Sequence, residues 1–137
     1  MPATFAPHSV NLSVSDLDSS IAWYRDVFGF QEFYRNSYPE MQLEIAFLKQ
    51  GEFEIELIKF GGSVAGTQCP DAPRHTAVRG ITHVALRVPS LEKAISDLAA
   101  HGVKPVWGIK VFPELKMSVV FFRDPDGNQL KLVEKQE

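Results

Sequence analysis

The sequence predicts an α+β fold built from two tandem copies of one β-α-β-β-β module. The first observation is an internal repeat: the segment at Ser9 resembles the segment at His83, and the offset of 74 residues recurs between Leu17 and Leu91. The second is that both copies open with alternating apolar and polar residues, which is typical of a half-buried strand. The third is a helical apolar stripe that follows each opening strand.

The two predicted helices have clear ends. Asp16 and Ser90 stand where a side-chain oxygen caps a helix N-terminus. Gly29 follows the first helix as a C-terminal residue, and the second helix ends before Gly102. Apolar residues recur at spacings of three and four in both helices: Leu17, Ile21, Tyr24 and Phe28 in the first, and Leu91, Ile95 and Leu98 in the second.

Three further strands are expected in each half. They are Gln31–Tyr34, Met41–Lys49 and Glu52–Lys59 in the first half, and Val103–Val106, Lys116–Arg123 and Gln129–Glu134 in the second. The chain 1–137 is therefore one domain of two modules, about 7–60 and 80–135, joined by a linker at 61–79. This linker is long, so we expect it to close over a pocket or to reach a partner subunit. Its one histidine, His75, is expected to be solvated.

One face of each sheet is predicted to line a cavity. A single helix covers only one face of a four-stranded sheet, so the second face must be buried against the equivalent face of the other half. Polar residues project onto that second face, and a polar yet enclosed face is more typical of a cavity than of a core. These residues are Ser9, Asn11, Ser13, Glu54, Glu56, His83, Arg87, Gln129 and Lys131.

Composition excludes several classes of partner. The net charge of −3 and the pI near 5.8, with no block of basic residues, argue against a nucleic-acid partner. No apolar run approaches the roughly 20 residues that span a bilayer, so we expect no membrane association. The N-terminus lacks the features of a secretion signal, and the single cysteine, Cys69, cannot form an intramolecular disulfide. We therefore expect a cytoplasmic protein.

Three segments carry a resemblance to a known family: Ser15–Gly29, Gly80–Val88 and Phe122–Leu132. The sequence resembles the vicinal oxygen chelate superfamily, which includes glyoxalase I, bleomycin-resistance proteins and extradiol dioxygenases. The resemblance implies mixed sheets that curve around a central cavity, a small-molecule ligand and a homodimer. It does not identify the reaction, because a fold hosts many chemistries.

The positions that hold a metal in such relatives are altered here. By resemblance, the four ligand positions fall on Ser9, Glu56, His83 and Lys131. Serine is a poor ligand for a divalent ion, and the lysine ammonium brings positive charge to the place of the cation. We predict that no metal and no other cofactor is bound. If a divalent metal ion were present, His83 and Glu56 would be its ligands.

The altered site predicts metal-free acid–base chemistry on a small metabolite. Glu56 would abstract a proton next to a carbonyl, Lys131 would hold the developing oxyanion, and His83 would shuttle or donate a proton. Such a set fits an isomerase, epimerase, cyclase or lyase. Further residues are expected to contact the ligand: Ser9, Asn11, Arg87, Trp107, Phe121 and Gln129.

Other readings of the same residues remain open. Lys131 and Glu56 could form an ion pair that only plugs the former metal site. The chain could instead be a non-catalytic protein that binds a drug or metabolite, as bleomycin-resistance relatives do. A metal-dependent lyase of the glyoxalase I type, or an extradiol dioxygenase with unusual ligands, ranks below both.

Overall fold

The computed structural model describes residues 3–136, and the chain divides into two compact units, 1–65 and 66–137, which are described separately. The division falls inside the expected linker. The first unit contains β1 (Ser9–Ser13), α1 (Leu17–Phe28), β2 (Gln31–Tyr38), β3 (Leu43–Gln50) and β4 (Phe53–Phe60). The second contains β5 (Val84–Arg87), α2 (Leu91–Ala100), β6 (Trp107–Phe112), β7 (Met117–Arg123) and β8 (Gln129–Lys135).

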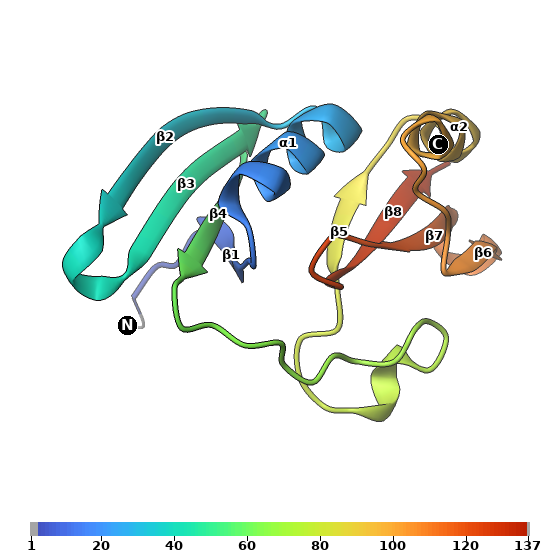
Figure 1. The fold of residues 1–137 in the computed structure, drawn as a ribbon. Helices are drawn as coiled ribbons and strands as arrows, with labels where there is room; N and C mark the ends of the chain where they lie inside the picture. Colours follow the sequence, from blue (N-terminus) through green and yellow to red (C-terminus); the bar gives the residue numbers. More distant parts are fainter. Residues whose placement is uncertain (1–2, 137) are drawn as a thin grey trace. The chain divides into compact units, whose positions relative to one another are not determined.

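Both units have the same sheet topology (Figure 1). The strand order is β1-β4-β3-β2 in the first sheet and β5-β8-β7-β6 in the second. In each sheet the opening strand pairs in parallel with the closing strand, and the remaining pairs are antiparallel. The prediction of two β-α-β-β-β modules with mixed sheets is confirmed.

The helix ends follow the sequence prediction. Asp16 Oδ1 accepts a hydrogen bond from Ser19 N at 2.9 Å, and Ser90 Oγ accepts one from Lys93 N at 3.2 Å. Gly29 ends α1 with a φ of 75°, a left-handed conformation that glycine adopts without a steric penalty. Among the described residues, neither helix is long and apolar enough to cross a membrane.

Each helix packs on one face of its own sheet and builds a core there. In the first unit, Leu17, Ile21 and Tyr24 of α1 are buried against β3 and β4. In the second, α2 packs on β7 and β8 and buries Leu91 and Leu98. The inward residues of each sheet alternate with outward ones, as pleated strands require. The most enclosed of them are Ala46, Leu48, Ile55 and Leu57 in the first unit, and Val120, Phe122, Leu130 and Leu132 in the second.

A repeated turn shifts two of the expected strands. The segments Pro39–Met41 and Pro113–Leu115 each form one turn of 3-10 helix, and the next residues, Gln42 and Lys116, have φ of 55° and 51°. These turns delay β3 to Leu43 and β7 to Met117. The first turn begins only at Pro39, and β2 therefore extends to Tyr38, four residues beyond its expected end.

The strand expected at Val103–Val106 is wrong, because β6 runs from Trp107 to Phe112. Val103 N donates to Leu98 O and so belongs to the end of α2. Pro105 follows, and proline has no N–H to contribute to a sheet ladder. Val106 N then donates to Phe121 O, Trp107 pairs with Phe121, and after a shift in register the pairing with β7 continues from Lys110.

Candidate functional site

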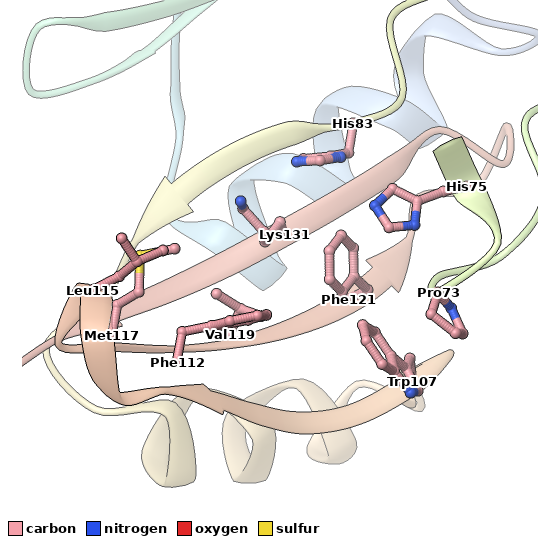
Figure 2. Close-up of a pocket in the computed structure, with 10 residues that line it drawn as sticks. All are labelled: Pro73, His75, His83, Trp107, Phe112, Leu115, Met117, Val119, Phe121 and Lys131. Carbon is pink, nitrogen blue, oxygen red and sulfur yellow. The ribbon is translucent and has the colours of Figure 1, made fainter. Parts of the chain in front are cut away.

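The second unit carries a pocket on the face of its sheet that α2 leaves uncovered. Its volume is about 250 Å³, at the small end of the range for ligand sites. Figure 2 shows its walls, which come from β6, β7, β8, the turn Pro113–Leu115 between β6 and β7, the residue before β5 and the segment that precedes it. The residues that line it are Pro73, His75, His83, Trp107, Phe112, Leu115, Met117, Val119, Phe121 and Lys131.

Lys131 places an ammonium group in this largely apolar pocket. It lies on β8 between Ala85 of β5 and Phe121 of β7, so the sheet register holds it at the centre of the uncovered face. The residue is half-buried, and no Asp or Glu lines the pocket. The two ion pairs found within residues 66–136 are Lys93–Asp97 and Arg123–Asp71, and neither includes Lys131. Its charge is therefore available to a ligand.

His83 lies directly before β5, one residue outside the strand in which it was expected. Its Nδ1 lies 2.7 Å from Thr82 Oγ1, and its ring meets Phe121 edge-on at 5.3 Å between centroids. Burial lowers the pKa of the His83 imidazole below its ordinary value, and the nearby Lys131 and His75 lower it further. At neutral pH the ring is consequently an uncharged base beside a cation.

His75 corrects the expectation of a solvated loop histidine. Its ring lies 5.5 Å from the ring of His83 and 5.0 Å from that of Phe121, measured between centroids. It is half-buried, and its Nδ1 is enclosed without a hydrogen-bond partner in the described structure. The loop therefore contributes a polar side chain to the pocket wall. Sequence patterns missed it because 61–79 has no periodicity from which to read a face.

The loop is held against the sheet by two residues of its neighbouring strands. Gln129 Oε1 accepts from Ala72 N at 2.9 Å, and its Nε2 donates to Thr82 O at 3.4 Å. Arg123 donates to Cys69 O at 2.7 Å and to Asp71 Oδ1 at 2.9 Å.

The expectation that Gln129 contacts the ligand is thereby corrected. Its side chain is 2% exposed and is used to anchor the loop. Arg123, which is not among the predicted site residues, also anchors the loop.

The remaining ligand contacts expected in the second unit separate into two groups. Trp107 and Phe121 line the pocket, and their rings lie 5.9 Å apart. Arg87 does not line it: the residue is exposed and borders a separate surface hollow with Val88, Pro89 and Lys135. It projects from β5 too far along the strand, opposite Val133, to contribute to the pocket.

The first unit brings together three of the expected site residues. Ser9 Oγ donates to Asn11 Oδ1 at 2.8 Å, and Asn11 Nδ2 donates to Glu56 Oε2 at 3.4 Å. Parallel pairing of β1 with β4 sets Asn11 opposite Glu56. The neighbouring His8 is exposed, and its Nδ1 lies 3.9 Å from Glu54 Oε2. This histidine therefore does not take the place of Ser9 as a candidate metal ligand near Glu56. The expected role of Glu56 as a base stays a prediction.

Known proteins share this sequence pattern and fold. The sequence profile of the Glyoxalase/Bleomycin resistance protein/Dioxygenase superfamily matches residues 6–132. The chain belongs to this superfamily. The uncharacterized protein YaeR of Escherichia coli is 30% identical over 131 residues, which cover 93% of this chain and 95% of YaeR.

Two further proteins of similar sequence, one a named enzyme and one a solved structure, match most of the chain. A lactoylglutathione lyase of Haemophilus influenzae is 29% identical over 129 residues, covering 91% of this chain and 89% of the lyase. Among solved structures, SMU.1112c is 29% identical, covers 96% of this chain and 100% of its own, and superposes with a TM-score of 0.79.

The metal that the superfamily implies does not fit the residues of the pocket. His75 and His83 are the two side chains there that bind divalent ions well, and Lys131 places a positive charge beside His83. Within either unit, residues 3–136 offer no cluster of three His, Cys, Asp or Glu side chains that could hold a metal ion. A cation in this pocket would be repelled by the ammonium and would lack carboxylate ligands.

Replacing Gln129 by leucine tests the anchoring of the loop. Gln129→Leu is expected to lower the free energy of unfolding by about 1–3 kcal/mol, because the buried Ala72 N–H loses its acceptor. Urea denaturation followed by circular dichroism measures the change. Gln136→Leu, at an exposed position, serves as the control and should stay within about 0.5 kcal/mol of the parent. Equal stability of the two variants would contradict the anchoring role.

An NMR titration of the histidine rings tests the electrostatics of the pocket. His83 is expected to take up its proton at a lower pH than a free histidine, because its folded-state pKa is lowered. Lys131→Gln removes one positive charge and should raise the pKa of His83, whereas Lys135→Gln, outside the pocket, should leave it unchanged. A His83 pKa above the ordinary value in the parent protein would contradict this description.

Proposed function

We propose that this chain is a metal-independent member of its superfamily, which binds a small molecule through a carbonyl or carboxylate oxygen and moves a proton next to that carbonyl. The observation that carries the proposal is Lys131, whose ammonium lies in an apolar pocket without a carboxylate partner among the lining residues. A half-buried cation of this kind favours negative charge on a ligand oxygen beside it.

The surroundings of Lys131 strengthen that attraction. Phe121, Val119 and Met117 exclude water from one side of the pocket, and electrostatic attraction is stronger where water is excluded. Negative charge that develops on a carbonyl oxygen would therefore be stabilised more than the neutral carbonyl. This difference between the ground state and the transition state is what accelerates a reaction.

His83 has the properties of a proton carrier in that reaction. Its lowered pKa keeps the ring uncharged at neutral pH, so an unprotonated nitrogen is available. The C–H bond next to the carbonyl breaks, its proton passes to the imidazole, and its electron pair moves to the oxygen beside Lys131. Return of a proton to carbon completes an isomerisation or epimerisation without a net change in oxidation state.

Binding without chemistry is the second candidate function. Most of the lining is apolar or aromatic, including Trp107, Phe112 and Phe121, and such walls hold an apolar ligand body. Several relatives are named lactoylglutathione lyase. That activity fits this chain poorly, because lysine stands at a position that the resemblance assigns to a metal ligand.

Exchange of hydrogen for deuterium in phenylpyruvate tests both candidates. This compound has a carbonyl, a carboxylate and an aromatic ring, and its protons next to the carbonyl are visible by NMR. In D₂O the protein is expected to speed their exchange above the buffer rate. Lys131→Gln should abolish the acceleration, and Lys135→Gln should retain it.

The outcomes of this experiment separate the candidates. Binding of phenylpyruvate without faster exchange would favour the binding protein. Exchange that survives in Lys131→Gln would contradict the role of the ammonium. Glu56→Gln, measured alongside, tests the prediction from the sequence that Glu56 is the base, since that prediction requires the acceleration to disappear.

A further inference from the structure

We propose that His75 completes the ligand site: its imidazole, together with Lys131 and His83, binds the carboxylate of a small aromatic or branched monocarboxylic acid. This inference rests on the proposed function and names its ligand class. The three groups come from the loop, from the residue before β5 and from the middle of β8. All three line the pocket, and in Figure 2 the ring of His83 stands between the amine of Lys131 on one side and the ring of His75 on the other.

The donor and acceptor pattern of this corner favours an anion. His75 Nδ1 is enclosed without a hydrogen-bond partner in the described structure, so Nε2 is the ring nitrogen that we assign to the ligand. His83 Nδ1 is already engaged with Thr82 Oγ1, whose hydroxyl can either donate or accept. When the hydroxyl donates, His83 Nε2 carries the proton and donates to a bound carboxylate; when it accepts, Nε2 is unprotonated and is available as the base of the proposed function. With the three N–H donors of Lys131, the corner has several donors and no carboxylate to receive them.

Other classes of ligand fit this corner poorly. A cationic ligand would be repelled by Lys131, and no Asp or Glu lines the pocket to compensate. A purely apolar ligand would displace water from Lys131, His83 and His75 and leave their nitrogens without partners, which is unfavourable in an enclosed site. A carboxylate accepts hydrogen bonds from all three groups and neutralises the ammonium.

The rest of the pocket limits the body of the ligand. The rings of Phe121 and Trp107 lie 5.9 Å apart, and Val119 and Met117 continue the apolar surface. A volume of about 250 Å³ accommodates one ring or one branched chain in addition to the carboxylate. The ligand class is therefore a small monocarboxylic acid with an apolar body.

The loop holds His75 in place before a ligand arrives. Gln129 binds the backbone at Ala72, and Arg123 binds it at Cys69, a few residues before His75. The ring of His75 also packs against Phe121. A group that is already ordered loses little entropy on binding, so its hydrogen bond contributes to both affinity and specificity.

Calorimetric titration with two matched probes tests the inference. Phenylacetate has a carboxylate, and phenylacetamide has the same shape without the charge. The parent protein is expected to bind phenylacetate more tightly. His75→Phe keeps an aromatic ring but removes both nitrogens, and it should weaken phenylacetate binding about ten- to a hundredfold, the effect of one hydrogen bond to a charged group. Phenylacetamide should be affected much less.

Three further variants identify the cause of any loss. His75→Gln retains an N–H donor and should recover part of the affinity for phenylacetate. His101→Phe changes a histidine at the end of α2 that does not line the pocket, and it should bind phenylacetate like the parent. Lys131→Gln should remove the preference for the acid over the amide.

Each outcome decides between the two proposals. If Lys131→Gln weakens phenylacetate binding and His75→Phe does not, the role of His75 is refuted and the proposed function stands. If neither variant weakens it, or if the parent does not prefer the acid, both are refuted. The ring signals of ¹³C-labelled histidine in the parent protein provide a check that needs no variant: an unchanged His75 signal on addition of phenylacetate would overturn the inference.

Discussion

The ammonium group of Lys131 is the constraint on which the proposed chemistry of this protein depends. A positive charge that is partly shielded from water in an aromatic pocket is stabilised by a partner of opposite charge. None of the residues that line the pocket carries a negative charge. Burial lowers the pKa of His83, and the positive charge of Lys131 lowers it further, which favours the neutral ring. In the proposed function, this one side chain disfavours a bound cation, attracts an anion and helps to keep the base beside it unprotonated.

The loop before β5 is the second element of the site. It follows no regular secondary structure over most of its length, yet Gln129 and Arg123 bind its backbone and Ala72 is buried with Val119, Phe121 and Val133. The sheet alone would leave the pocket open on this side. With the loop anchored, His75 and Pro73 form a wall, and His75 joins His83 and Lys131 as a polar group of the pocket.

The sequence predicted the modules and half of the pocket because these follow from periodicity. The repeat from Ser9 to His83, the caps at Asp16 and Ser90, and the position of Phe121 and Lys131 on the face without a helix all depend on spacing along regular elements. Where periodicity fails, the predictions failed too. Pro105 displaced β6, and the turns after Pro39 and Pro113 displaced β3 and β7, although these prolines share the 74-residue offset that could have revealed the turns. The alternation of side chains along the strand also placed Gln129 on the same face as Lys131. It could not show that the side-chain amide of Gln129 already forms hydrogen bonds with the backbone of the loop.

The most direct test of the central claim is a crystal structure of the protein soaked with Ni²⁺ or Zn²⁺, with anomalous diffraction measured at the absorption edge of the metal. The account predicts electron density for the Lys131 side chain inside the pocket and no anomalous peak next to His83. A peak within coordinating distance of His83 Nε2, with the Lys131 amine turned out of the pocket, would contradict it.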